Sequence, residues 1–243
     1  MRKDIKVSVS ILCADFKYLA DEVKKCEDSG ADMLHVDVMD GHFVPVITVG
    51  KMIVEAIRPI TKLPIEAHLM IENPYAHIDD FLNAGADIIS VHAECYGQRR
   101  KGCRNFGEYP KEVDKIDIEL ARKDIKKVHD SGKEIIMTVN PGTPLCFDEI
   151  LPEIDGVLIM SVNPGFAKQK FMPVALPKIQ ALSRTFKGYI AVDGGVNADT
   201  AQSVIDAGAN VLATASYFFG AQDPSQAVKY LKSLKPQKHK KRA

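Results

Sequence analysis

The chain has 243 residues, of which 46% are hydrophobic and 26% are charged. These proportions are typical of a folded globular protein and exclude the disordered and fibrous classes. Lys and Arg number 32, and Asp and Glu also number 32, so the formal net charge is zero. That balance disfavours a dedicated nucleic-acid binder. No apolar run approaches the roughly 18 residues of a membrane span, so no membrane partner is expected.

The amino-terminal segment and the cysteines predict a cytoplasmic protein. Basic residues near the amino terminus precede only a short apolar run, and Asp15 follows with no cleavage-like sequence, so we expect no signal peptide. The five cysteines are odd in number and scattered, and none forms a CxxC pair. They predict free thiols in a reducing compartment rather than a disulfide framework or a cysteine zinc site.

In chain order, short β-branched runs alternate with stretches of helical spacing. Leu19, Val23 and Cys26 illustrate that spacing, because residues three or four apart share one face of a helix. The short apolar runs predict strands. The eight predicted strands are Val7–Ile11, Met33–Val38, Ile65–Met70, Ile88–His92, Glu134–Val139, Val157–Val162, Tyr189–Val192 and Val211–Thr214.

Glycine separates the predicted helices from the strands that follow. Ser29-Gly30-Ala31-Asp32, Ala84-Gly85-Ala86-Asp87 and Ala207-Gly208-Ala209-Asn210 share one pattern, and Ser131-Gly132-Lys133 resembles it. Glycine ends a helix by adopting a left-handed conformation. Eight strand–helix units in about 230 residues predict a single-domain α/β protein, a (β/α)8 TIM barrel. The alternative, an open doubly wound sheet, is disfavoured because Ile11–Asp15 lacks a glycine-rich phosphate fingerprint.

Two segments depart from this alternation. A long polar loop at about residues 94–117 follows the fourth predicted strand, and a basic C-terminal tail occupies residues 235–243. We expect the barrel to span residues 1–234. A loop of this length is either functional or disordered. The tail is expected to be solvated, with electrostatic contact to RNA or acidic surfaces as the alternative.

Polar side chains gather at the ends of the predicted strands, where barrel active sites form. His35 and Asp37 alternate with valines and therefore face the same side. Taken alone, this pair is best interpreted as a structural ion pair. His68 and Asp193 end two further strands. Two imidazoles and two carboxylates together predict a site for one divalent metal ion: Zn²⁺, Fe²⁺, Co²⁺ or Mn²⁺.

Other strand-end residues predict an anion site or the barrel wall. Turns after the last three strands contain Gly165, Gly194-Gly195 and Ala215-Ser216, which either bind phosphate through backbone N–H groups or only make tight turns. His92 has no acidic neighbour in register and is interpreted as a wall residue. The remaining histidines expected at the surface are His42, His77 and His129.

Five stretches resemble the ribulose-phosphate 3-epimerase family, and the resemblance covers nearly the whole chain apart from the long loop and the tail. It implies a (β/α)8 barrel that interconverts D-ribulose 5-phosphate and D-xylulose 5-phosphate with one divalent metal. It also implies a homo-oligomer, a dimer or a hexamer. The His35–Pro45 stretch is specific for this family and its hexulose-phosphate relatives. The five stretches are Ser8–Leu12, His35–Pro45, His68–Met70, Ser161–Phe166 and Val192–Val196.

The resemblance also implies roles for individual residues. Asp37 and Asp193 would act as proton acceptor and donor on opposite faces of C3, because inversion needs a base on one face and an acid on the other. The metal would stabilise the enediolate as charge develops. The implied metal ligands are His35, Asp37, His68 and Asp193. The implied substrate-binding residues are Ser10, His68, Gly165, Phe166, Ala167, Lys168, Gly194, Gly195, Ala215 and Ser216.

Departures from the family pattern lie where substrate would be held. The family's Gly-Phe-Gly-Gly is Gly165-Phe166-Ala167-Lys168 here, its Gly-Ser is Ala215-Ser216, and an Asn is replaced by Val46. Each lost glycine adds a Cβ atom, which blocks close approach or disfavours positive φ, although Lys168 would add a charge for phosphate. Three functions remain: a pentulose-5-phosphate 3-epimerase, a 3-epimerase of a hexulose 6-phosphate, and a non-catalytic barrel that binds a sugar phosphate. The retained acid–base pair disfavours the third.

Overall fold

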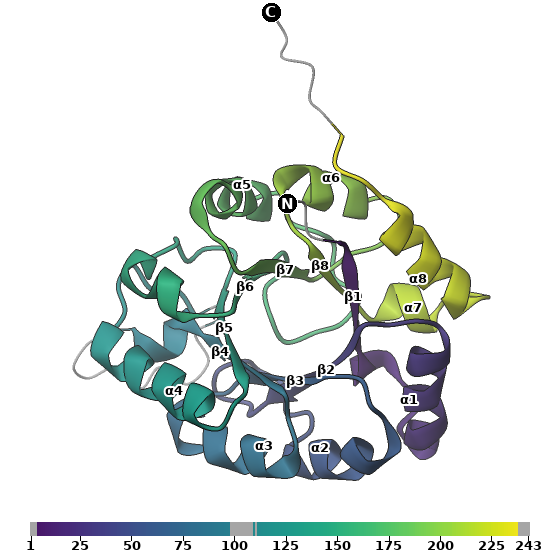
Figure 1. The fold of residues 1–243 in the computed structure, drawn as a ribbon, viewed down its shortest axis with the longest axis horizontal. Helices are drawn as coiled ribbons and strands as arrows, with labels where there is room; N and C mark the ends of the chain where they lie inside the picture. Colours follow the sequence, from purple (N-terminus) through teal and green to yellow (C-terminus); the bar gives the residue numbers. More distant parts are fainter. Residues whose placement is uncertain (1–3, 98–108, 110, 238–243) are drawn as a thin grey trace, which may run out of the picture.

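A computed structural model describes residues 4–97, 109 and 111–237. Eight parallel strands form a closed barrel in which each strand pairs with its neighbours in sequence and β8 pairs with β1 (Figure 1). The predicted single-domain TIM barrel is therefore confirmed. The strands are β1 Lys6–Ser10, β2 Met33–Met39, β3 Ile65–Met70, β4 Ile88–His92, β5 Glu134–Val139, β6 Gly156–Met160, β7 Tyr189–Asp193 and β8 Val211–Thr214.

Helices surround the barrel as an outer ring (Figure 1). The predicted helical spacing places Val23 and Cys26 on the buried face of α1, as expected. The α-helices are α1 Leu19–Asp28, α2 Lys51–Ile57, α3 Ile78–Ala84, α4 Ile118–Asp130, α5 Ala175–Thr185, α6 Ala201–Ala207, α7 Ser216–Phe219 and α8 Pro224–Ser233. Short 3₁₀ turns are η1 Ile11–Cys13, η2 Phe16–Tyr18, η3 Arg58–Ile60, η4 Pro74–Ala76, η5 Ala93–Tyr96 and η6 Asp148–Glu153. None of the helices in these ranges is long and apolar enough to cross a bilayer.

Two strands end earlier than predicted because a serine redirects the backbone. Ser10 Oγ accepts the N–H of Leu12, so Ile11 begins η1 instead of extending β1. Ser161 Oγ donates to the carbonyl oxygens of Asp193 and Gly194 at 2.8 and 2.6 Å. Ser161 therefore leaves β6, which ends at Met160. Both corrections concern the mouth of the barrel, where the chain turns toward the loops.

The barrel interior is layered. Valines and isoleucines on the outer face of the strands pack against the helices in the main hydrophobic core. Inside the barrel, one apolar cluster extends from Met33, the first residue of β2, to Met160, the last residue of β6. Met39 and Met70 belong to a second apolar cluster at the mouth. The buried polar residues of the strands are Ser8, Ser10, His35, Asp37, Glu66, His68, Ser90, His92, Thr138 and Thr214.

The amino-terminal ends of the strands are joined pairwise by one repeated hydrogen bond. A side-chain oxygen just before an even-numbered strand accepts a backbone N–H from the preceding odd-numbered strand, at 2.8–3.1 Å. The pairs are Asp32 with Val7, Asp87 with Ile65, Asp155 with Ile135 and Asn210 with Ile190. We call these four acceptors the strand-pair clamps. They explain why Asp or Asn follows Gly-Ala in three of the predicted glycine motifs.

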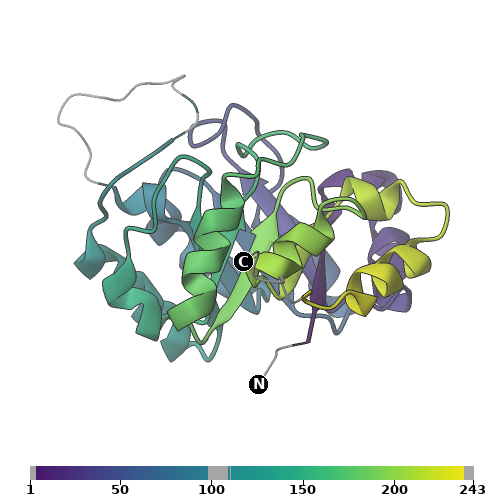
Figure 2. The ribbon, with the colours of Figure 1, turned by 90° about the horizontal axis from the view of Figure 1, so that it is seen from above.

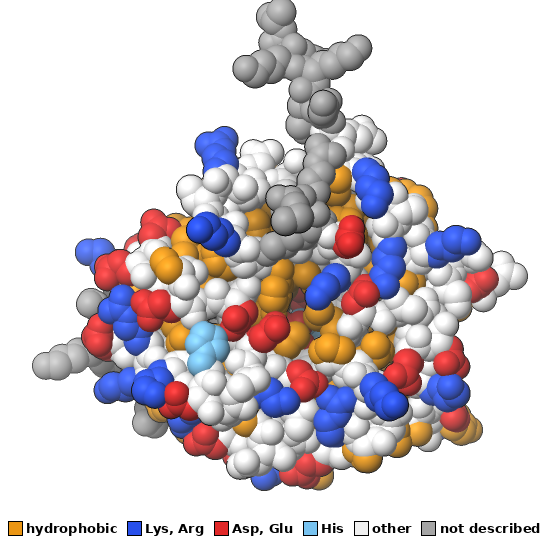
Figure 3. Space-filling model, in the orientation of Figure 1, with side chains coloured by type: hydrophobic (Ala, Val, Ile, Leu, Met, Phe, Trp, Pro, Cys, Tyr) orange, Lys and Arg blue, Asp and Glu red, His pale blue; other side chains and the backbone are white. Residues whose placement is uncertain are grey.

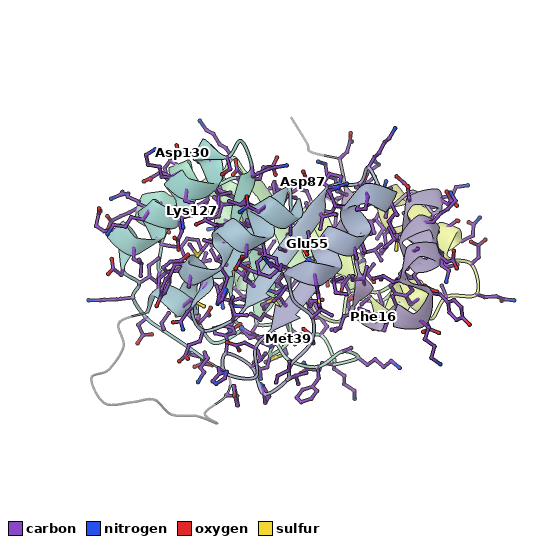
Figure 4. All side chains as sticks on the ribbon, turned by 90° about the horizontal axis from the view of Figure 1, so that it is seen from below. Phe16, Met39, Glu55, Asp87, Lys127 and Asp130 are labelled. Carbon is purple, nitrogen blue, oxygen red and sulfur yellow. The ribbon has the colours of Figure 1, made fainter. Side chains whose placement is uncertain are left out.

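The clamps lie on the face opposite the barrel mouth. Figure 4 shows Asp87 at one end of the barrel and Met39, the last residue of β2, at the other. Figure 3 views the clamp face, where acidic and basic side chains surround a hollowed centre. Asp32, Asp87 and Asn210 line this hollow. Figure 2 shows the start of β1 at this end and the loops after β2 and β6 at the other.

The described ends of the predicted long loop are anchored to the barrel. Gly97 and Ile116 form an antiparallel bridge, and Asn140 Nδ2 donates to the carbonyl oxygen of Lys111 at 2.8 Å. Tyr109 donates its hydroxyl to the carbonyl oxygen of Gly41 at 3.3 Å. Residues 98–108 and 110 of the loop, residues 238–243 of the tail, and Cys103 lie outside the described residues. The other four cysteines are free thiols, and the domain boundaries stay predictions.

Candidate active site

Four side chains meet at the mouth of the barrel: His35 and Asp37 from β2, His68 from β3 and Asp193 from β7. One ligand atom from each lies within 4.8 Å of all the others. Strand geometry causes this meeting, because His35 and Asp37 are two residues apart on one strand and Asp37 is the register partner of His68. We call these residues the metal-ligand cluster.

The distances in the cluster suit a divalent metal. His35 Nε2 and His68 Nδ1 are 3.0 Å apart, and each lies 3.2 Å from Asp37 Oδ1. Two ligands at right angles, each about 2.1 Å from one metal ion, lie about 3.0 Å from each other. Two imidazole nitrogens and two carboxylates are also ligands that Zn²⁺, Fe²⁺, Co²⁺ and Mn²⁺ accept. The residues therefore fit the expected metal.

Three buried side chains behind the cluster hold its histidines. Glu66 Oε2 accepts a hydrogen bond from His35 Nδ1 at 2.8 Å. His92 Nε2 is 2.8 Å from His68 Nε2, and His92 Nδ1 is 3.2 Å from Glu94 Oε2. His92 belongs to the barrel wall, and its register partner is Thr138, which is not acidic, as predicted. Its acidic neighbour is Glu94, which lies beyond the end of β4. The chain turns into η5 after His92 and brings Glu94 back toward the ring.

Glu66 and Glu94 were not predicted from the sequence, although period-two spacing indicates Glu66. Glu66 is two residues before His68 in β3 and is the register partner of His35. Glu94 is two residues after His92. Spacing by two places side chains on the same side of a strand, which accounts for Glu66 within β3. Glu94 lies in η5, beyond the end of β4, so strand alternation does not place it.

The surroundings of Asp37 and Asp193 move their pKa values in opposite directions. Burial by itself would raise the pKa of Asp37, but His35 and His68 outweigh it and lower that pKa below 3.8. Burial, reinforced by the negative charge of Asp37, raises the pKa of Asp193 above 3.8. Ser10 Oγ donates to Asp37 Oδ2 at 2.5 Å. A pair of carboxyl groups separated in this way can provide a base and an acid at one pH.

The two ligand histidines also differ. Burial opposes the charged form of His35, but Glu66 and Asp37 outweigh it and raise the pKa of His35 well above 6.5. Burial lowers the pKa of His68, and the neighbouring His35 and His92 add to that effect against the opposing influence of Asp37. Because metal ligation requires the deprotonated ring, a metal ion would compete with a proton chiefly at His35.

A cavity of about 350 Å³ opens next to the cluster. His35 and His68 lie behind its surface, fully buried. Met39, Met70 and Met160 add an apolar part to the lining. The predicted site residues that line the cavity are Ser10, Asp37, Gly165, Phe166, Ala167, Lys168, Asp193, Gly194, Gly195, Ala215 and Ser216. The expected surface histidines, His42, His77 and His129, are exposed and lie outside it.

Backbone conformation in the loops explains which glycines the site requires. Gly195 has φ +65°, and a Cβ atom there would lie 2.8 Å from the backbone nitrogen of Phe171. Lys168 has φ +62° and is the only non-glycine with positive φ in the described part of the chain. Ala215 has a negative φ of −128°. The lost glycine therefore places a side chain in the left-handed region at Lys168 and not at Ala215.

The closed parallel barrel, with an acid–histidine cluster and a cavity at its mouth, defines a TIM-barrel enzyme. The sequence profile described as Ribulose-phosphate 3 epimerase family matches residues 6–106 and 112–219. The chain belongs to this family and is an epimerase of the isomerase class.

Named relatives match nearly the whole chain. It is 43% identical to ribulose-phosphate 3-epimerase of Bacillus subtilis (strain 168), over 95% of this chain and 100% of the relative. It is 42% identical to the Synechocystis protein of the same name, over 97% of this chain and 96% of the relative. A solved 3-hexulose-6-phosphate synthase from Salmonella typhimurium superposes with a TM-score of 0.62 at 16% identity, covering 94% of this chain and 97% of that one. That likeness shows the fold alone.

Proposed function

We propose that the protein catalyses epimerisation at C3 of a ketose phosphate, converting D-ribulose 5-phosphate to D-xylulose 5-phosphate. The observation that carries the proposal is the pair Asp37 and Asp193, which share the metal-ligand cluster and line one cavity. Their opposite pKa shifts suit a two-base reaction, because one carboxyl group must accept a proton while the other donates one.

In this mechanism the protein moves two protons. Ionised Asp37 takes the proton from one face of C3, and protonated Asp193 returns a proton to the opposite face, so that the configuration inverts. The roles exchange in the reverse direction. The metal-ligand cluster would hold one divalent ion, Zn²⁺, Fe²⁺, Co²⁺ or Mn²⁺, which supplies positive charge to stabilise the developing enediolate. Ser10 orients Asp37 by its hydrogen bond and would contact the sugar.

The far end of the cavity would bind the phosphate group. Backbone N–H groups of glycine turns suit an anion, and Lys168 would add a positive charge. The methionines would exclude water from the reacting carbon. The residues proposed for this end are Gly165, Phe166, Ala167, Lys168, Gly194, Gly195, Ala215 and Ser216, all of which line the cavity.

A 3-epimerase of a hexulose 6-phosphate is the second candidate. Ala167, Lys168 and Ala215, which replace family glycines, all line the cavity. They therefore alter the region that would distinguish a five-carbon from a six-carbon substrate, while the metal-ligand cluster is complete. A non-catalytic sugar-phosphate-binding barrel would need no acid–base pair and is disfavoured.

Proton NMR in D₂O tests the proposal. Metal-loaded protein should convert D-ribulose 5-phosphate to xylulose 5-phosphate with deuterium incorporated at C3. Asp37→Asn or Asp193→Asn should lower the rate by at least about 10²-fold, because each removes one proton-transfer group. Exchange only with a hexulose 6-phosphate would favour the second candidate. Absence of exchange with both sugars would refute the proposed epimerisation.

Assembly and location follow from the family and stay predictions. We expect a homo-oligomer, a dimer or a hexamer, and a cytoplasmic location. Analytical ultracentrifugation of the full chain measures the first directly.

A further inference from the structure

Three buried side chains, Glu94, His92 and His68, form a hydrogen-bonded row that begins just after β4 and ends in the metal-ligand cluster. Glu94 Oε2 lies 3.2 Å from His92 Nδ1, and His92 Nε2 lies 2.8 Å from His68 Nε2. The side chains of His92 and Glu94 have no exposed surface, and His68 is equally buried. We call Glu94 and His92 the tautomer relay.

The hydrogen bond between the two imidazole rings is well aligned. The rings are inclined by only 14°, and their centroids are 5.0 Å apart. That separation is close to what two rings reach when a 2.8 Å N···N vector runs in the plane of both. One ring must therefore donate an N–H and the other must accept it. The direction of this bond decides where His68 carries its proton.

The single proton of neutral His68 can lie on either ring nitrogen. On one side, Nδ1 lies 3.2 Å from Asp37 Oδ1 and 3.0 Å from His35 Nε2, and a proton on Nδ1 would be donated toward these atoms. On the other side, Nε2 can donate to His92 Nε2, provided that His92 carries its own proton on Nδ1. Glu94 meets this condition because a carboxylate only accepts hydrogen bonds, so its contact with His92 Nδ1 requires the proton on that nitrogen. The metal requires the second arrangement, in which His68 Nδ1 keeps a free lone pair.

Glu94 is itself held in place from a neighbouring strand. Its second oxygen, Oε1, accepts the backbone N–H of Asn140 at 2.8 Å, just after the end of β5. Both oxygens of Glu94 are thus occupied, one by the backbone and one by His92. Glu94 is therefore fixed at one end of the relay, where it accepts the proton of His92 Nδ1, so that His92 Nε2 accepts from His68 Nε2.

We propose that Glu94 and His92 are positioning residues that hold His68 with its proton on Nε2 and thereby prepare Nδ1 to bind the metal. The proposal rests on the metal-dependent function proposed above. Glu94 and His92 touch neither the cavity nor the ligand atom itself, and they act through the proton of His68.

Glu94→Gln tests the direction of the relay without removing its volume. The backbone N–H of Asn140 requires an oxygen acceptor, so the glutamine NH₂ would face His92 Nδ1. His92 would then donate from Nε2, and the proton of His68 would move to Nδ1. Asp124→Asn is the matched control, because Asp124 is buried and accepts the hydroxyl of Tyr96 at 2.7 Å outside the relay.

Two measurements read the outcome without using catalysis. ¹⁵N NMR of histidine-labelled, metal-free protein reports the tautomers, and chelator competition measures Co²⁺ affinity. We expect His68 to carry its proton on Nε2 in the unsubstituted chain and in Asp124→Asn, but on Nδ1 in Glu94→Gln. Co²⁺ affinity of Glu94→Gln should fall about 10- to 100-fold, the usual effect of losing a hydrogen-bond partner of a ligand histidine.

Other outcomes separate this proposal from the proposed function. A proton on Nδ1 of His68 in the unsubstituted, metal-free chain would overturn the relay even if Glu94→Gln failed to fold. So would Glu94→Gln with unchanged tautomers or with the Co²⁺ affinity of the control. Failure of the proposed function would instead appear as expected tautomers and Co²⁺ binding without exchange at C3 of either sugar phosphate.

Discussion

Lys168 occupies a backbone conformation that favours glycine. Its φ of +62° costs a side-chain-bearing residue about 1 kcal/mol or more. The chain nevertheless carries lysine there, in the cavity lining, where the family pattern has glycine. A charge that binds phosphate would offset this strain when substrate is present.

Lys168→Gly should therefore stabilise the fold but weaken the binding of substrate. The free energy of unfolding should rise by about 1 kcal/mol as the strain is relieved. KM for the sugar phosphate should rise about tenfold with kcat nearly unchanged, because phosphate binding contributes equally to ground and transition states. Steady-state kinetics and urea unfolding measure the two effects. Lys170→Gln is the control, since Lys170 is exposed and outside the cavity lining; equal KM values for both variants would contradict the assignment.

At the same scale, the sequence indicates the reacting residues better than the residues that support them. His35, Asp37, His68 and Asp193 could be predicted because strand alternation and strand ends together bring them to the mouth. Glu66 and Glu94 were missed because the sequence does not show that a glutamate is fully buried against a particular ring. Their significance depends on register between β2 and β3 and on the turn after β4.

At the scale of elements, the strand-pair clamps connect the sequence pattern to the closure of the barrel. Asp87 shows the arrangement most fully: Oδ2 accepts from Ile65 N and Arg58 Nη1, and Oδ1 accepts from Lys133 Nζ. Glycine motifs could therefore predict the order of elements. They could not predict the ends of β1 and β6, because the hydrogen bonds of Ser10 and Ser161 decide those. Three of the clamps lie in the glycine motifs, but Asp155 does not, because Gly-Ala does not precede it.

Asp87→Asn should destabilise the fold by about 1–2 kcal/mol at pH 7, since charge-assisted hydrogen bonds to a partly exposed group are lost. Despite burial, Lys133 and the N–H of Ile65 lower the pKa of Asp87 below 3.8 in the folded state. The contribution of the Asp87 carboxylate to stability is therefore complete above the pKa that Asp87 has in the unfolded chain. It is lost as the pH falls through the lower pKa of the folded state.

Urea unfolding between pH 7 and pH 2 measures that difference. The gap between the unsubstituted chain and Asp87→Asn should narrow only in the acid part of the range. Asp130→Asn is the control, because Asp130 is exposed and pairs with Lys126 on the outer surface of α4 (Figure 4). An Asp87→Asn difference that was no larger than the control, or that grew toward low pH, would refute the role of the clamp.

At the scale of the whole molecule, the metal-ligand cluster connects strands that are distant in sequence. Its ligands come from β2, β3 and β7, and β7 closes back toward β2 through β8 and β1. A metal ion bound there would hold the two halves of the barrel together at the mouth, while the clamps pair strands at the opposite end. Stability should therefore depend on metal even though the apolar core is continuous around the barrel.

Removing metal should lower the melting temperature, and the loss should depend on pH. Metal at 100 times its Kd adds about 2.7 kcal/mol, which corresponds to about 5–10 °C for a chain of this size. Because Glu66 and Asp37 raise the pKa of His35 well above 6.5, a proton competes with the metal at that ring. The metal-dependent increment should grow as the pH rises toward that pKa and shrink as it falls. Calorimetry with Mn²⁺ or with EDTA between pH 6 and pH 8 measures this increment in melting temperature. The control is His77→Asn, which alters an exposed histidine and should keep the full pH dependence. An increment that stayed constant across this pH range would exclude competition between proton and metal at His35.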